Sequence, residues 1–209
     1  NDQNLDDYVY ENAEGDKKQY FPEILSAETP ILMEHEDYGI AIYPEGTFKN
    51  VKIEKEEYTN SYEETQQVPL KAVYDVQGEA FAYEYTSTSS GVKEEIVLEE
   101  KPENNQFQYD LKLTGMTARK NQLDEGITLY DSKSEEIVGS IARPNMNDAT
   151  GEAYSEELTC DITKDETEEG LYHVTITADK GYLEDVQRKY PVTIDPSASW
   201  SGKSDIGDA

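Results

Sequence analysis

Apolar and polar residues alternate along many short stretches of this chain, and a period of two is typical of β-strands with one buried face. The clearest stretch is residues 107–113, where Phe107, Tyr109 and Leu111 share one side of the predicted strand. The same pattern predicts strands at residues 38–43, 51–53, 70–76, 79–86, 92–98, 127–130, 137–141, 158–162 and 171–178.

Turn residues separate these strands. Gln77 and Gly78 lie between two of them and predict a β-hairpin. A helical pattern occurs at residues 182–188, with Asp179 available as its N-terminal cap. Many short strands with minimal helix predict an all-β fold, an antiparallel β-sandwich. One extended sandwich and two tandem sandwiches divided near residues 101–105 both fit, and the absence of a long linker favours one.

The two ends of the chain differ from the middle. Residues 1–20 are acidic, with almost no aliphatic pattern, and are expected to form a solvated arm or a weak edge strand. Tyr190, Val192 and Ile194 predict a last strand, which Pro196 ends because proline has no N–H for a sheet. We therefore expect an arm at 1–20, a β-sandwich domain at 21–196, and a linker with the start of a following module at 197–209, with Trp200 exposed in the linker.

Charge narrows the range of partners. The 209 residues carry 46 Asp and Glu against 18 Lys and Arg, a formal net charge of -28. Phosphate backbones and anionic lipid headgroups bind clustered cations and are repelled by such a field. No stretch approaches the roughly 18 apolar residues of a membrane span. The composition therefore predicts no nucleic-acid partner and no membrane insertion.

Few residues are suited to nucleophilic catalysis. The histidines are His35, in a hydrophilic turn, and His173, on the polar face of its predicted strand. Cys160 alternates inward with Leu158 and Ile162, as expected of an inert buried thiol. No nucleophile elbow, phosphate-binding glycine loop or zinc-ligand spacing occurs. We therefore expect no catalytic residues and no cofactor.

Carboxylates offer two weaker candidates. Glu94 shares a strand face with Val92 and Ile96, so it is expected to be buried or paired with a cation, unless a bulge turns it outward. A catalytic role for it is the minority alternative. Asn145, Asn147 and Asp148 alternate oxygen donors as in a calcium loop, although the pattern departs from an EF-hand, and an Asx-type turn is the alternative.

Four motifs occur in order between residues 90 and 196: residues 90–98 (SGVKEEIVL), 107–112 (FQYDLK), 143–152 (RPNMNDATGE) and 188–196 (RKYPVTIDP). Together they resemble the segment just upstream of the DNRLRE module in large secreted, wall-associated Firmicutes proteins of the Rhs (YD-repeat) type. Residues 203–209 resemble the opening of that module. The resemblance covers about residues 70–209 and implies an extracellular, cell-wall-linked setting without catalytic residues in this segment.

These observations together predict a non-enzymatic extracellular structural or binding module of a large secreted or cell-wall-associated bacterial protein. Its expected partners are adjacent modules of the same polypeptide, cell-wall polysaccharide or another surface protein. A carbohydrate-binding module is the first alternative, and it requires an exposed row of aromatic residues or a cleft. A glycoside-active enzyme is the second, and it requires a pocket with two converging acids.

Overall fold

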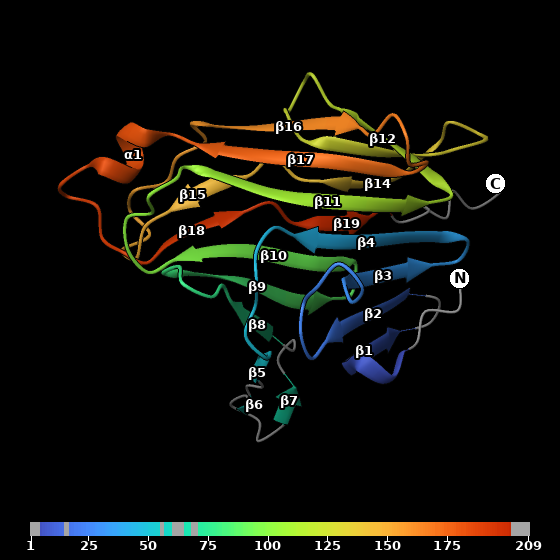
Figure 1. Cartoon of the computed structure of the whole chain (residues 1–209), viewed down its shortest axis with the longest axis horizontal. Helices are drawn as coiled ribbons and strands as arrows, with labels where there is room; N and C mark the ends of the chain where they lie inside the picture. Colours follow the sequence, from blue (N-terminus) through green and yellow to red (C-terminus); the bar gives the residue numbers. More distant parts are fainter. Residues whose placement is uncertain (1–4, 15–16, 55–56, 60–64, 68–70, 202–209) are drawn as a thin grey trace.

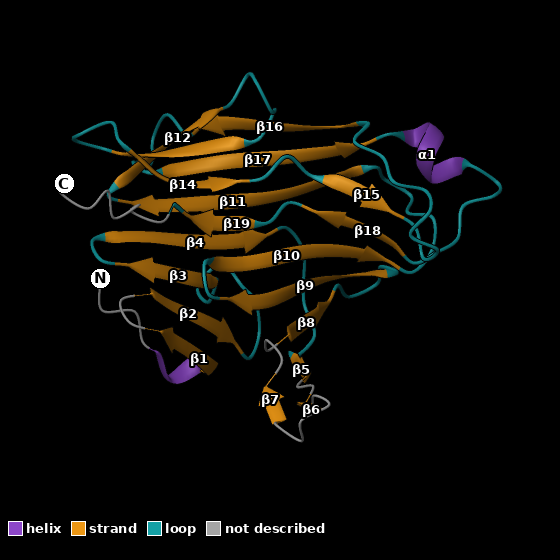
Figure 2. Cartoon of the chain, turned by 180° about the vertical axis from the view of Figure 1, so that it is seen from behind, coloured by secondary structure: helices purple, strands orange, loops and turns teal. Residues whose placement is uncertain are grey.

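The structure is a computed structural model that describes residues 5–14, 17–54, 57–59, 65–67 and 71–201. Within these residues almost every regular element is an antiparallel β-strand, and the strands form two large sheets that pack face to face (Figure 1, Figure 2). The all-β sandwich predicted from the alternation of side chains is confirmed.

The first sheet has seven strands and joins the N-terminal region to the middle and the end of the chain. Its order is β1-β2-β3-β4-β11-β17-β16. The bounds are β1 (Tyr8–Glu14), β2 (Lys17–Pro22), β3 (Ile31–His35), β4 (Tyr38–Pro44), β11 (Gln106–Thr114), β17 (Leu171–Ala178) and β16 (Leu158–Lys164).

The second sheet has ten strands and the main order β12-β13-β14-β19-β10-β9-β8-β5, with β15 and β18 paired beside β10. A separate pair is formed by β6 (Glu57–Thr59) and β7 (Thr65–Gln67). The bounds in the large sheet are β12 (Met116–Lys120), β13 (Ile127–Asp131), β14 (Ile137–Ile141), β19 (Ala198–Trp200), β10 (Gly91–Leu98), β9 (Phe81–Thr88), β8 (Lys71–Asp75), β5 (Lys52–Glu54), β15 (Asn145–Asn147) and β18 (Val192–Asp195).

The strand order decides between one sandwich and two. Both sheets combine strands from before and after residues 101–105, since β4 pairs with β11 and β10 pairs with β18 and β19. A division of the chain near residue 101 would cut through both sheets. The described residues therefore form one continuous sandwich.

Tyrosine fills much of the space between the sheets. Tyr74, Tyr83, Tyr85 and Tyr109 are almost completely buried, with edge-to-face contacts such as the 6.0 Å between the ring centroids of Tyr74 and Tyr85. A buried hydroxyl needs a hydrogen-bond partner. The Tyr74 hydroxyl donates to the carbonyl of Pro22 at 2.8 Å and so ties β8 to β2 across the core. Tyrosine thus supplies both apolar area and polar links between sheets.

The sandwich begins earlier than the sequence indicated. Of the two predicted alternatives for residues 1–20, a solvated arm and an edge strand, the edge strand is present, because β1 lies at the edge of the seven-stranded sheet. Residues 17–20 form most of β2, and Gln19 of β2 is only 2% exposed. Its amide nitrogen donates to the carbonyls of Thr88 at 2.8 Å and Gly91 at 2.7 Å, and its amide oxygen accepts from Ser87. A polar residue in an acidic stretch therefore connects β2 to the β9–β10 hairpin.

The sandwich also ends later than predicted. Residues 198–200, expected in an exposed linker, form β19 between β10 and β14, and Trp200 is 3% exposed rather than solvated. The expected exposure of Trp200 was wrong because Pro196 ends β18 without ending the sheet. After Pro196 the chain forms β19, which pairs with β10 and β14. The predicted start of a further module at residues 203–209 lies outside the described residues.

The predicted helix is present but displaced. Helix α1 spans Lys180–Glu184, and the side chain of Asp179 accepts the backbone N–H of Tyr182 at 2.7 Å as the predicted cap. The helix stops before Asp185, which is in extended conformation. In the part of the chain that the structure describes, no helix has the length and apolar character needed to cross a bilayer.

Close approach of backbones at β19 gives a first prediction. A Cβ added at Gly91 would lie 2.4 Å from the Ala198 carbonyl oxygen, so Gly91→Ala should lower the free energy of unfolding by about 2 kcal/mol through overpacking. Urea denaturation measures this. Gly39→Ala is the matched control, because its Cβ would meet Thr114 at an ordinary 3.5 Å. Equal effects of the two substitutions would contradict the role assigned to Gly91.

Candidate functional site

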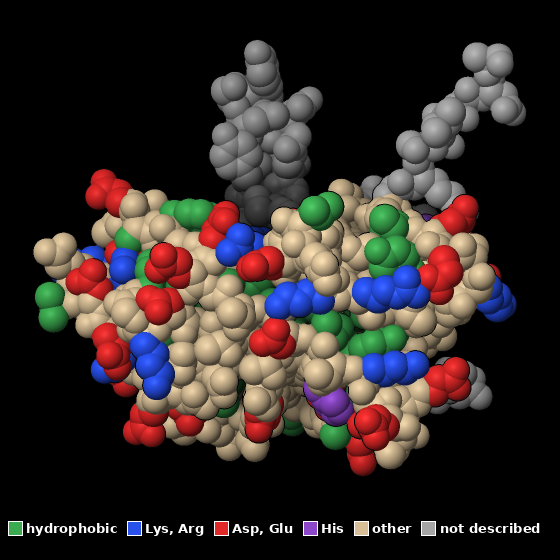
Figure 3. All heavy atoms as spheres, turned by 90° about the horizontal axis from the view of Figure 1, so that it is seen from above, with side chains coloured by type: hydrophobic (Ala, Val, Ile, Leu, Met, Phe, Trp, Pro, Cys, Tyr) green, Lys and Arg blue, Asp and Glu red, His purple; other side chains and the backbone are tan. Residues whose placement is uncertain are grey.

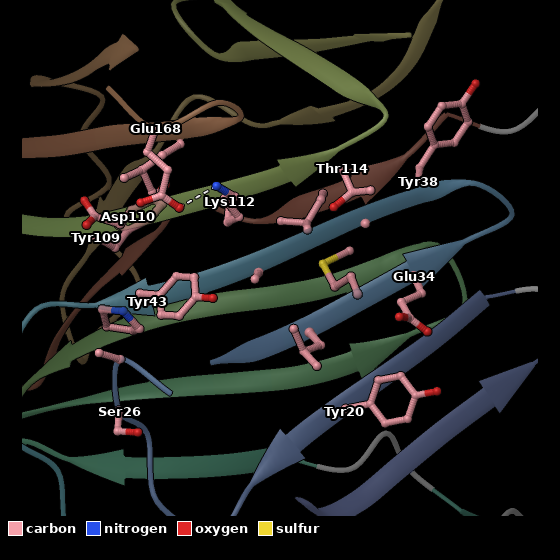
Figure 4. A pocket seen from close by; sticks show the side chains of 18 of the residues that line it. Tyr20, Ser26, Glu34, Tyr38, Tyr43, Tyr109, Asp110, Lys112, Thr114 and Glu168 are labelled. Atoms are coloured by element: carbon pink, nitrogen blue, oxygen red, sulfur yellow. Dashed lines mark hydrogen bonds and ion pairs between the residues drawn. The ribbon is translucent and has the colours of Figure 1, made fainter. Parts of the chain in front are cut away.

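A groove of about 1250 Å³ lies on the outer face of the seven-stranded sheet, the face turned away from the ten-stranded sheet (Figure 4). Its floor comes from residues that alternate with core residues. In β3, for example, Ile31 and Met33 belong to the core between the sheets, whereas Leu32 belongs to a separate apolar cluster. The strand alternation that builds the sandwich core therefore also places these side chains in the groove.

Strand register arranges the floor in rows. In one row, Tyr20 of β2 pairs with Leu32 of β3, Leu32 with Ala41 of β4, and Ala41 with Lys112 of β11. In the next row, Tyr43 of β4 pairs with Asp110 of β11, and Asp110 with His173 of β17. Residues separated by up to about 150 positions are thus neighbours on one surface.

Small side chains on β4 account for the hollow. Gly39 and Ala41 occupy two of its outward positions, and Tyr43 occupies the next one. Tyr20 and Leu32 lie on one side of Ala41 and Lys112 on the other. Because β4 lies in the middle of this surface, a missing side chain there lowers the floor between two higher borders. Figure 4 shows Tyr20 on β2 and Lys112 on β11, on either side of β4, and Tyr43 on β4 itself.

The floor is apolar. Tyr20, Leu32 and Ala41 are 4%, 6% and 7% exposed, and the Tyr8 ring packs edge-on against Tyr20 at 6.1 Å between ring centroids. Tyr43 packs on the same cluster and is half-buried. Burial is the main cause that raises the pKa of the Tyr43 hydroxyl, with the nearby Glu168 carboxylate adding to it. These phenol groups are therefore neutral and act as apolar surface with a polar tip.

Carboxylates surround this floor, and the cations among them are paired. Lys112 forms an ion pair with Glu168. His173 bonds Asp110 through Nδ1 at 2.7 Å and Asp165 through Nε2 at 3.1 Å, and these carboxylates raise the pKa of the imidazole. His173 lies on the polar face of its strand as predicted. Both of its nitrogens are occupied by carboxylates, so neither is available to accept a substrate proton.

Glu94 does not line the groove. It lies in the core between the two sheets. It is 3% exposed, as its strand phase predicts, and its carboxylate accepts the Tyr85 hydroxyl at 2.9 Å. Of the two predicted alternatives, burial with a raised pKa and pairing with a cation, the structure shows burial, and the Tyr85 hydroxyl provides the hydrogen bond. Burial, with a smaller contribution from Asp195, raises the pKa of Glu94 to about 8.

The surroundings of Glu94 are other core residues. The Tyr109 hydroxyl is buried and finds no partner among the residues that the structure describes, and its pKa is raised first by burial and then by Glu94. Cys160 is buried and unbridged as predicted, and burial raises the pKa of its thiol to about 11. Glu94 and Cys160 are thus held protonated at neutral pH inside the core, away from the groove.

The calcium candidates do not converge on a common point. The side chains of Asn145 and Asn147 bond each other at 3.0 Å. Asp148 accepts the Thr150 and Lys189 backbone N–H groups and lies 3.7 Å from the Arg188 guanidinium. The Thr150 hydroxyl also donates to Asp148 and is the main cause that lowers the pKa of this carboxylate, and the two backbone N–H groups and Arg188 add to the effect. The carboxylate therefore serves as a turn and loop anchor, and no grouping of three potential metal ligands occurs within the described ranges.

His35 is also in a different environment from the predicted turn. It ends β3 and is partly buried, with its ring 5.8 Å from that of Trp200. The residues that sequence reasoning missed are those of the groove floor. Alternation marked Tyr43 as strand, but Tyr20 was assigned to the arm, and the outward row becomes visible only when four strands are placed in register.

Three relatives match part of this chain. The tRNA nuclease WapA of Bacillus subtilis (strain 168), the tRNA(Glu)-specific nuclease WapA of Bacillus subtilis subsp. natto and the tRNA3(Ser)-specific nuclease WapA of Bacillus spizizenii are each 36% identical over 121 residues. The match covers 56% of this chain and 5% of each relative. No family model and no solved structure matches the chain.

These names correct three expectations. A non-enzymatic module, the absence of enzymatic activity and the exclusion of nucleic acid from the partners are all contradicted by similarity to enzymes named for acting on tRNA. The alternatives that involve carbohydrate gain no support from these names. The error arose because the charge and motifs of 209 residues were used to infer the activity and partners of a whole protein. The chain spans only 5% of the length of the curated relatives that it matches.

The raised pKa of Glu94 predicts how stability changes with pH. The unfolded chain loses this proton near 4.5 and the folded chain near 8, so the free energy of unfolding falls as pH rises through this window. Glu94→Gln keeps an acceptor for Tyr85 without this titration. We expect the variant to gain on the order of 5 kcal/mol over the wild type between pH 4.5 and 8, because each pKa unit corresponds to about 1.4 kcal/mol.

Chemical denaturation of both proteins at several pH values gives this difference. His173, whose raised pKa contributes a loss of the same sign, is present in both proteins and cancels. A difference between the two proteins that stays constant with pH would show that Glu94 is ionised in the fold.

The bonds of Asp148 predict indifference to calcium. Because Arg188 and two backbone N–H groups already surround the carboxylate, the thermal unfolding midpoint should be the same in excess calcium and in excess chelator. Differential scanning fluorimetry tests this. A midpoint that rises with calcium, and does so less in Asp148→Asn, would contradict the assignment of Asp148 as an anchor.

Proposed function

We propose that this chain is part of a nuclease that cleaves tRNA. The observation that carries the proposal is the similarity to three tRNA nucleases over more than half of the chain. Because the chain spans a small share of those relatives, the activity is proposed for the whole protein.

The pattern of matches supports a role that is independent of the particular tRNA. The identity is the same, 36%, to a relative named for tRNA(Glu) and to one named for tRNA3(Ser). A segment that selected the tRNA would be expected to favour one of them. We therefore propose that this segment contributes to what these nucleases have in common and that tRNA selection depends on other residues.

Electrostatics supports the same division. RNA binding requires cations that replace the counterions of phosphates. In the described part of the chain, Lys112, Arg119 and Lys120 each contact a carboxylate, and Figure 3 shows Lys and Arg side chains next to Asp and Glu on one face of the molecule. We therefore assign phosphate binding to the protein as a whole and not to these three residues.

We also propose an extracellular, wall-associated setting for the protein. The ordered motifs that resemble the segment upstream of the DNRLRE module support it, and so does a highly charged exterior that favours solubility. Within that setting the sandwich is one folded segment of the nuclease.

A cleavage assay with the complete protein that contains this segment tests the proposed function. Bulk tRNA, 5S rRNA and double-stranded DNA are incubated separately, and we expect cleavage of tRNA only, seen as discrete fragments on a denaturing gel. The 209-residue chain is assayed in parallel to show whether it cuts tRNA by itself. Intact tRNA in the presence of the folded complete protein would refute the proposal.

A further inference from the structure

We propose that the groove on the outer face of the seven-stranded sheet binds a cationic, extended polypeptide segment. The chemistry of the partner follows from the groove itself. The source that we assign to it, the cationic RNA-binding part of the nuclease, depends on the function proposed above.

The shape of the groove suits an extended chain. The row Tyr20–Leu32–Ala41–Lys112 crosses four neighbouring strands. The hollow extends from Ala41 in this row to Gly39 in the adjacent row, where Gly39 pairs with Glu34 and Thr114. An extended segment can lie in such an open trough with alternate side chains pointing to the floor. A deep, closed cavity of the kind that surrounds a small ligand is not what this surface offers.

The apolar floor suits the stems of long cationic side chains. Lysine and arginine bury their methylene groups against apolar surface and keep their charge at the border. Tyr20, Leu32 and Tyr43 provide that surface, and tyrosine rings also attract cations to their faces. The floor is therefore an argument for lysine and arginine that does not depend on the carboxylates.

The charge of the border is complementary to such a segment. Among the described residues that line the groove, the acidic and basic residues are one lysine, Lys112, and six acids, Glu34, Glu36, Asp37, Glu45, Asp110 and Glu168. Lys112 is paired with Glu168, and Asp110 is paired with His173. Glu34, Asp37 and Glu45 are exposed and remain available to a cationic partner.

The same protein is expected to contain that partner. A tRNA nuclease needs a cationic surface to hold phosphates, and a segment with a net charge of -28 attracts such a surface over long distances. RNA itself is a poor occupant, because its phosphates would face the six carboxylates of the border. Docking in the groove would hold a cationic segment of the same protein against the sandwich.

A titration with synthetic peptides tests the groove. The probe is a peptide of about eight residues with alternating lysine and serine, long enough at about 3.3 Å per residue to cross four strands. The control peptide has glutamate in place of lysine. Isothermal titration calorimetry with the full chain should show binding of the lysine peptide alone, and weaker binding as salt screens the charges.

A pair of matched variants locates the binding. The groove variant Glu34→Gln/Asp37→Asn/Glu45→Gln and the control variant Glu79→Gln/Glu103→Gln/Glu152→Gln each remove three exposed carboxylates. Because total charge changes equally, only a specific site distinguishes them. We expect the groove variant to bind the lysine peptide about tenfold more weakly and the control variant to stay within about twofold of the wild type.

A third variant tests the floor. Tyr43→Ala leaves every carboxylate in place and removes half-buried aromatic surface, so it should also weaken peptide binding, with thermal unfolding as the check on folding. Unchanged affinity in this variant would mean that the carboxylates act alone, which would overturn the groove as the site.

The remaining outcomes also decide the matter. Equal losses in the groove and control variants would show non-specific attraction to an acidic protein and overturn the proposal, as would absence of binding. Binding of bulk tRNA that the groove substitutions alter would assign the groove to RNA instead. The peptide titration contains no RNA, so the two proposals can fail separately. Peptide binding without tRNA cleavage by the complete protein would refute the proposed nuclease function and support the groove as a peptide site. Cleavage of tRNA without peptide binding would support the nuclease function and refute the groove as a peptide site.

Discussion

The sandwich depends on the last described residues of the chain, which lie in the middle of its larger sheet. Strands β12, β13 and β14 reach the rest of that sheet through β19, and β15 reaches it through β18. This insertion requires backbones to approach closely at Gly91 and Gly139, where a Cβ would lie within 3 Å of a carbonyl oxygen of β19. Glycine at these two positions therefore allows β19 to join β12, β13 and β14 to the rest of the sheet.

Burial gives one residue type two different roles on the two faces of the sandwich. Glu94, between the sheets, has a raised pKa and is uncharged at neutral pH, so it behaves as a hydrogen-bonding core residue. Glu34, on the outer face, is exposed and contributes to the border of the groove. The strongly acidic composition therefore says little about either site until each carboxylate is assigned to a face.

The groove and the similarity to tRNA nucleases concern different scales. The groove is a property of four strands, whereas the activity in the relatives' names belongs to proteins of which this chain covers 5%. Net charge misled the sequence interpretation because it was applied to the partners of the whole protein. Applied to the segment alone, the same charge argues for a cationic partner, and the geometry of the groove specifies where that partner would lie.

The alternation of side chains by itself determined the all-β class and the inward positions of Glu94 and Cys160, and the helical pattern after Asp179 determined the cap of α1. These features depend on neighbours within a few residues. It did not reveal the burial of Gln19 and Trp200, since each is fixed by hydrogen bonds or packing with strands far away in sequence. The groove was decided by register alone. Tyr20, Ala41 and Lys112 are ordinary strand residues until β2, β3, β4 and β11 are aligned, and only tertiary pairing sets that alignment.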